Sequence, residues 1–308
     1  MRWIALVVAA MPLLCGAVEF RGVAGEELRG AAVVPGVRPR LLTWGKSLLE
    51  WTLPQGKKRV LATPRKPFGE GGCLTEEGDG LFLQEDDGSL VLRRAPDWQS
   101  SILDHGIDMH DCLATTLFGR RGVLVLQRGM QLRFYEAPDF HYLEIYSFYS
   151  LTRQGGLLLA GADIVCGNYW IRRPDKYEEP WLLFAIEVYN ELPLSGMLRL
   201  ALLPGGGELV IAQGEMVQGR VTRLRKPDDP KQLWIEERLG ELHYPHALLN
   251  TSKGVLIGEE NGPHSRLFAL RPGTSTLRQI GETNGVHTAL AYGTRVILVG
   301  RNSIYLRK

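Results

Sequence analysis

The sequence lacks an excess of charge of either sign. Its 308 residues include 36 Lys and Arg against 34 Asp and Glu, so the formal net charge is only +2. A protein that recruits nucleic acid through its overall field carries a strongly positive surface or a block of basic residues. We therefore expect no nucleic acid among the partners of this protein.

Common catalytic motifs are also missing. The sequence contains no Gly-x-Ser-x-Gly elbow, no His-Glu-x-x-His pair, no P-loop and no Cys-x-x-Cys pair. These absences favour a protein that is not an enzyme, although they leave the question open.

Long apolar runs are confined to the start of the chain, MRWIALVVAAMPLLCGAVEF. One Arg, an apolar run and small residues follow in the order typical of a secretory signal, so we expect a signal peptide over residues 1–17, cleaved after Ala17. The alternatives are lipidation at Cys15, an uncleaved anchor, or no export. We expect a secreted or periplasmic protein with no membrane span once the signal is removed.

Cysteines are few. Beyond residue 17 they are Cys73, Cys112 and Cys166, and an odd number cannot all pair within one chain. Their apolar neighbours indicate small buried side chains rather than a disulfide framework. The state of the three thiols stays open at this point.

Helical periodicity is absent after residue 17, and short β-rich runs repeat instead. Strand-like runs end at prolines about 40 to 50 residues apart, as in LVLRRAPDW and LRFYEAPDF. Repeats of this length that contain several short strands are typical of propeller blades. The prolines are Pro54, Pro96, Pro138, Pro174, Pro227 and Pro272.

Each repeat contains four strands, a to d, with the proline at the corner between c and d. The seventh repeat, from Val286 to Lys308, has only a, b and c. We predict that residues 18–25 supply its outer strand. The expected fold is all-β: one seven-bladed β-propeller domain over residues 18–308, built from four-stranded antiparallel blades and closed by an N-terminal strand. Trp98, Trp181 and Trp234 begin strands d and are expected to pack between blades.

Three phrases, ADIVCGNYWIRRP, GVLIGEENGPHSRLFALRP and NGVHTALAYGTRVILVG, resemble the FG-GAP/VCBS repeats of integrin α-subunit heads and of many secreted bacterial proteins. The resemblance implies the propeller fold and an Asp-rich Ca²⁺ loop in each a–b turn. Here those loops are degenerate, and only TEEGDG, with Glu76, Glu77 and Asp79, keeps acidic residues. Calcium needs six or more oxygen ligands, so we expect no calcium there and a solvated turn instead. No cofactor is expected from the family.

One face of such a propeller carries the d–a and b–c connections, and chemically useful side chains gather there. Convergent polar and aromatic groups of this kind are typical of small-ligand sites. The candidate ligand-binding residues are His110, Asn168, Tyr169, Trp170, His246, Glu259, Glu260, Asn261, His264, Arg266 and His287. Gln127, Arg128, Arg301 and Asn302 lie in the same connections.

Each candidate also has a structural interpretation. His110, His246 and His287 open strands a of three blades and could hold a transition metal at the channel mouth, or could satisfy backbone groups at blade corners. Tyr169 and Trp170 could pack between blades. Glu259 and Glu260 could be solvated loop charges, or acid/base catalysts.

Two functions follow. The first is an exported binding or scaffolding module, expected to be a monomer, that holds a small molecule, glycan or protein on this face. The second is a metal-dependent lyase or hydrolase acting on a carbohydrate-like substrate, with Glu259 or Glu260 as general base. A purely structural role is a third possibility.

Overall fold

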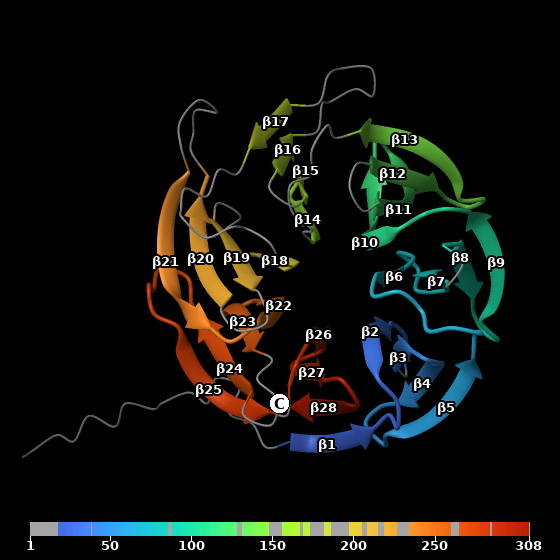
Figure 1. Cartoon of the computed structure of the whole chain (residues 1–308), viewed down its shortest axis with the longest axis horizontal. Coiled ribbons are helices and arrows are strands. Elements are labelled where there is room, and N and C mark those ends of the chain that lie inside the picture. Colours follow the sequence, from blue (N-terminus) through green and yellow to red (C-terminus); the bar gives the residue numbers. More distant parts are fainter. Residues whose placement is uncertain are drawn as a thin grey trace, which may run out of the picture.

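The computed structural model shows seven β-sheets arranged in a ring about a central axis (Figure 1). It describes residues 18–37, 39–85, 88–127, 131–147, 156–166, 169–172, 182–185, 197–204, 208–214, 219–226, 234–259, 265–283 and 285–307. All regular secondary structure in these ranges is β-strand.

Six blades are built from four consecutive strands each, and every neighbouring pair is antiparallel. Blade 1 contains β2 (Leu28–Val34), β3 (Arg40–Gly45), β4 (Leu48–Thr52) and β5 (Lys57–Ala62), and blade 2 contains β6 (Gly72–Leu74), β7 (Gly80–Gln84), β8 (Leu90–Arg94) and β9 (Gln99–Asp104). Blade 3 contains β10 (Met109–Leu117), β11 (Arg120–Gln127), β12 (Gln131–Glu136) and β13 (His141–Ser147), and blade 4 contains β14 (Leu157–Ala160), β15 (Asp163–Cys166), β16 (Tyr169–Arg172) and β17 (Leu182–Ala185). Blade 5 contains β18 (Met197–Leu202), β19 (Glu208–Gly214), β20 (Gly219–Arg225) and β21 (Ile235–Leu242), and blade 6 contains β22 (Pro245–Thr251), β23 (Gly254–Glu259), β24 (Ser265–Leu270) and β25 (Arg278–Thr283).

Blade 7 joins the two ends of the chain. It contains β26 (Thr288–Tyr292), β27 (Arg295–Val299) and β28 (Ser303–Arg307), and its outer strand is β1 (Val18–Val23). β1 runs antiparallel to β28, with Val18 opposite Arg307 and Val23 opposite Ser303. The all-β, seven-bladed fold closed by an N-terminal strand is therefore confirmed.

Pro54, Pro96 and Pro138 mark tight corners between strands c and d, as predicted. Pro272 lies in the longer c–d corner of blade 6, and Pro174 and Pro227 lie outside the described residues. The peptide bonds before Pro54, Pro96 and Pro138 are cis. In blades 2 and 3 the corner ends on an aromatic residue with positive φ, Trp98 (57°) and Phe140 (55°). Both aromatic rings are buried against the preceding blade, where Phe140 meets the ring of Phe82 at 5.2 Å.

The core lies between the blades rather than inside any one of them. Seven apolar clusters fill the seven junctions in the described part of the chain. At the junction of blades 1 and 2, the Trp44 ring fits only because Gly30 and Gly72 have no side chains. A Cβ atom at these positions would lie 2.3 Å and 2.5 Å from the ring.

The antiparallel order sorts the connections onto two faces. We call the face with the d–a and b–c connections the crossover face; its described segments include 24–27, 46–47, 63–71, 105–108, 243–244, 285–287 and 300–302. We call the opposite face, with the a–b turns and c–d corners, the corner face. Its described segments include 53–56, 75–79, 95–98, 118–119, 137–140 and 271–277.

Candidate functional site on the crossover face

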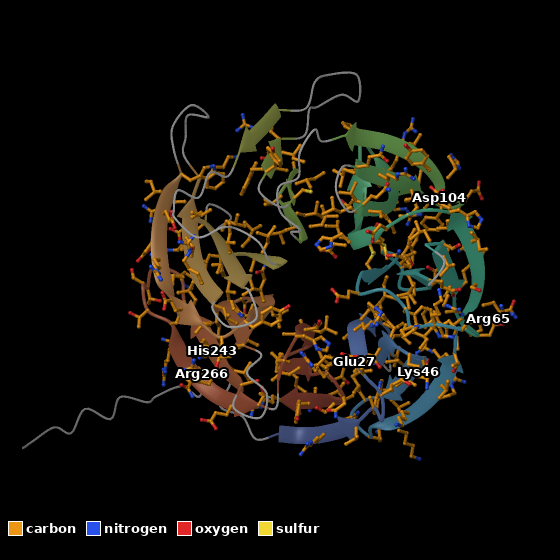
Figure 2. The ribbon with its side chains drawn as sticks, viewed as in Figure 1. Glu27, Lys46, Arg65, Asp104, His243 and Arg266 are labelled. Atoms are coloured by element: carbon orange, nitrogen blue, oxygen red, sulfur yellow. A yellow bond between two sulfur atoms is a disulfide. The ribbon has the colours of Figure 1, made fainter. Side chains whose placement is uncertain are left out.

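Glu259 is held in a buried ion pair. Its side chain, at the end of β23, is fully buried and accepts two hydrogen bonds from Arg266, Nε to Oε1 at 2.6 Å and Nη2 to Oε2 at 2.9 Å. The backbone N–H of His243 donates to Oε2 at 3.2 Å. Figure 2 shows His243 and Arg266 at neighbouring positions on blade 6. The carboxylate has a structural task and is sealed from solvent.

This pair also determines the charge state of Arg266. The hydrogen bond that Arg266 donates to Glu259 raises the pKa of the guanidinium, against the opposing effect of its own burial. The guanidinium therefore stays protonated and is not a candidate for proton transfer.

Glu259 belongs to a recurring arrangement on the crossover face. At four places a side-chain oxygen accepts a hydrogen bond from a backbone N–H in a connection or at the start of the next blade. The pairs are Glu26 with Ser47 (2.7 Å), Gln84 with Met109 (3.1 Å), Asp111 with Leu157 (2.8 Å) and Glu259 with His243. Backbone groups at such positions need partners, so much of the polar character of this face serves to hold the connections.

Trp170 is a packing residue. Its side chain is 3% exposed, and its ring lies 5.7 Å from that of Trp234, across the junction of blades 4 and 5. The indole Nε1 donates to Asp163 at 2.7 Å, and the ammonium of Lys226 lies 4.3 Å from the ring centre. Because the ring is buried against Trp234 and Lys226 and its N–H is bonded to Asp163, Trp170 is not available to stack on a ligand. Tyr169, its neighbour, is only half-buried.

The three candidate histidines lie in separate blades. His110 is half-buried in β10 of blade 3, whereas His287 is 7% exposed just before β26 of blade 7 (Figure 1). His246 lies in β22 of blade 6, but its side chain is outside the described part. Among the described residues no group of three or more His, Cys, Asp or Glu could hold a metal ion. The metal site stays a prediction.

Several other candidates fall outside the described residues, namely Asn168, Glu260, Asn261 and His264, together with Arg128. Trp181, expected to pack between blades, falls outside as well. Trp98 and Trp234 are buried between blades, as predicted.

Exposed charged side chains on the crossover face were missed by the sequence analysis. Glu27, Lys46, Arg65 and His243 are exposed in four different connections, and Figure 2 labels each of them. Their position in d–a and b–c connections was a usable signal.

The acidic turn between β6 and β7 uses its carboxylates within the protein. Thr75 Oγ1 donates to Asp79 at 2.7 Å, and Glu77 forms an ion pair with Arg121 of blade 3. These contacts give the turn a structural explanation that needs no ion.

Two of the cysteines form a disulfide, which the sequence did not predict. Cys73 in β6 and Cys112 in β10 are bonded, and they join the innermost strands of blades 2 and 3. The expectation that all three cysteines are isolated buried side chains was therefore wrong for this pair. It holds for Cys166, which is a free, buried thiol.

Comparison with known proteins gives likeness in structure but not in sequence. No family model matches the chain, and no curated protein matches it. A chain from the crystal structure of the Mitotic Checkpoint Complex is similar with a TM-score of 0.63 at 11% identity, covering 100% of this chain and 99% of that chain. The WD40 β-propeller domain of Doa1 is similar with a TM-score of 0.63 at 9% identity, covering 94% and 96%.

These likenesses show the fold alone. They support a seven-bladed propeller, and a shared fold does not by itself determine function. The resemblance to FG-GAP/VCBS repeats receives no support from any family model. Among the described residues, no helix is long and apolar enough to cross a membrane.

Proposed function

We propose that this protein is an exported, non-catalytic binding or scaffolding module that holds a small ligand, a glycan or a protein segment on its crossover face. The observation that carries the proposal is a face held rigid by side chain-to-backbone hydrogen bonds while it exposes Glu27, Lys46, Arg65 and His243. A preorganised surface loses little conformational entropy when a partner binds.

Export is supported by two independent features. The first is the apolar leader with small residues before Val18. The second is the disulfide between Cys73 and Cys112, because disulfides persist in oxidising compartments and are rare in the cytosol.

The alternative, a metal-dependent enzyme acting on a carbohydrate-like substrate, loses one of its two candidate bases. Glu259 is fully buried and bonded to Arg266, so it cannot reach a substrate. The remaining candidate, Glu260, lies outside the described residues. We therefore put the binding module first.

The proposal is tested by comparing the two faces. The exported protein is screened against a glycan array and a panel of secreted proteins, and affinities are measured for the Lys46→Ala, Arg65→Ala double variant and for Arg120→Ala, Arg121→Ala on the corner face. Loss of contacts at the binding face is expected to weaken binding about tenfold or more, with no change for the corner-face pair. Equal binding by both variants, or loss only in the second, would show that the wrong face has been chosen.

Metal analysis of the same purified protein separates the two functions. A stoichiometric transition metal that is lost on His287→Ala would favour the enzyme and count against the proposal.

A further inference from the structure

The c–d corner of blade 6 is longer than the tight corners of blades 1 to 3. It spans residues 271–277, whereas the corners of blades 1 to 3 span only 53–56, 95–98 and 137–140. The residue before the outer strand is aromatic in blades 2, 3 and 5, as Trp98, Phe140 and Trp234, but in blade 6 it is Leu277. A smaller side chain therefore stands where three other blades place a large ring.

A hollow of about 570 Å³ opens at this corner. Volumes of this order are typical of small-ligand pockets. Ala269, Leu277 and Ile280 contribute apolar surface, while Arg271 and Arg278 contribute guanidinium groups. The hollow thus offers an apolar surface and positive charge in one place.

The wall of the hollow is fixed by the neighbouring blade. Arg223 in β20 of blade 5 is buried and donates from Nη1 to the carbonyl of Thr274 at 3.0 Å and from Nη2 to Ser275 Oγ at 3.4 Å. Glu237 in β21 pairs with the same guanidinium. Hydrogen bonds from Ser275 and, to a smaller extent, from Arg223 lower the pKa of Glu237. The carboxylate that pairs with Arg223 is therefore charged at neutral pH.

Arg271 and Arg278 differ from other arginines of the corner face. Arg120, Arg121 and Arg225 each pair with a glutamate. Both Arg271 and Arg278 are exposed, and no carboxylate of the described chain lies within ion-pair distance of either. Guanidinium groups match carboxylate, sulfonate and phosphate groups in geometry and charge.

We propose that this hollow binds a small anion carried on an apolar body, with the apolar part against Ala269, Leu277 and Ile280 and the anionic group between Arg271 and Arg278. The site is separate from the crossover face. It is tested without reference to the function proposed there.

The test uses 8-anilinonaphthalene-1-sulfonate, with N-phenyl-1-naphthylamine as its counterpart lacking the sulfonate, and follows fluorescence on titration. We expect saturable binding of the sulfonate at one site. The double variant Arg271→Gln, Arg278→Gln should weaken it about tenfold or more, because two charge-assisted contacts are lost, and should change binding of the neutral compound much less. The matched control, Arg120→Gln, Arg121→Gln, removes the same charge from blade 3 and should bind as the unaltered protein does.

A second variant tests whether binding depends on the open space of the hollow. Leu277→Trp places at this corner the ring found in blades 2 and 5, so it should abolish binding of both compounds while leaving the melting temperature unchanged or higher. If this variant does not fold, the Arg271→Gln, Arg278→Gln double variant and its blade 3 control still test the proposal. Absence of saturable binding to the unaltered protein, unchanged affinity in the glutamine pair, or equal loss in the blade 3 control would overturn the proposal.

Discussion

The Glu259 carboxylate has no exposed surface, and its two oxygens are occupied by Arg266 and by the His243 amide. The Trp170 side chain is also buried and already has partners within the protein, namely Trp234, Lys226 and Asp163. Both residues were singled out because glutamate and tryptophan are common in binding sites. Their partners come from other strands or from another blade, and a linear sequence does not show which residues lie across a junction.

Replacing Arg266 should show how much the burial of the Glu259 carboxylate reduces the stability of the fold. We predict that Arg266→Ala lowers the free energy of unfolding by about 2 kcal/mol or more, because it leaves the Glu259 carboxylate buried without its countercharge. Glu259→Gln should cost less, and combining it with Arg266→Ala should recover part of the loss. Urea denaturation followed by fluorescence gives the free energy of unfolding of the two single variants and of the double variant.

A result in which Arg266→Ala is as stable as the unaltered protein would show that solvent reaches Glu259. It would then return Glu259 to the candidates for chemistry.

Among the strands, β6 is the shortest described inner strand, with three residues, whereas its neighbour β10 has nine. A short strand makes few ladder hydrogen bonds, and the disulfide between Cys73 and Cys112 fastens it to the next blade. The third cysteine differs. Complete burial raises the pKa of the Cys166 thiol, so it stays protonated and unreactive in the folded protein.

Replacing both bonded cysteines should weaken this element. We predict that Cys73→Ala, Cys112→Ala lowers the free energy of unfolding by about 3 kcal/mol, since the bond closes a loop between residues 39 apart in the sequence. Thiol titration of the denatured, unreduced mature chain should find one reactive group, Cys166, and three after reduction. Three thiols before reduction, in protein taken from an oxidising compartment, would contradict the disulfide.

In the whole molecule, stability depends on closure of the ring. β1 provides the outer strand of blade 7, and Ala24 and Leu28 just beyond it belong to the apolar cluster at the junction with blade 1. A closed ring has no exposed end blade, whereas an open one presents the faces of its first and last blades to water.

Deleting residues 18–25 should therefore destabilise the protein as a unit. We predict a loss of several kcal/mol in the free energy of unfolding, the scale expected for a lost strand and its buried contacts. Supplying the same eight residues as a separate peptide should restore part of the stability. Thermal melting with and without the peptide is the measurement, and unchanged melting of the deleted chain would argue against closure by this strand.

The fold was predictable from the sequence because its determinants are local and repeated. Pro96 and Pro138, each followed by Asp and an aromatic residue, mark the same corner twice, and the missing fourth strand after β28 indicated the role of residues 18–25. The site was less predictable. Its determinants are contacts between blades, such as Asp111 with Leu157 and Arg223 with Thr274, and these depend on three-dimensional placement.

The pairing of β1 with β28 also has a consequence for biosynthesis. A ribosome makes β1 before the other strands of the propeller and β28 after them, so the first strand of the domain must wait for the rest of the domain before its partner exists. During that interval it is an unpaired strand that could pair with another nascent chain.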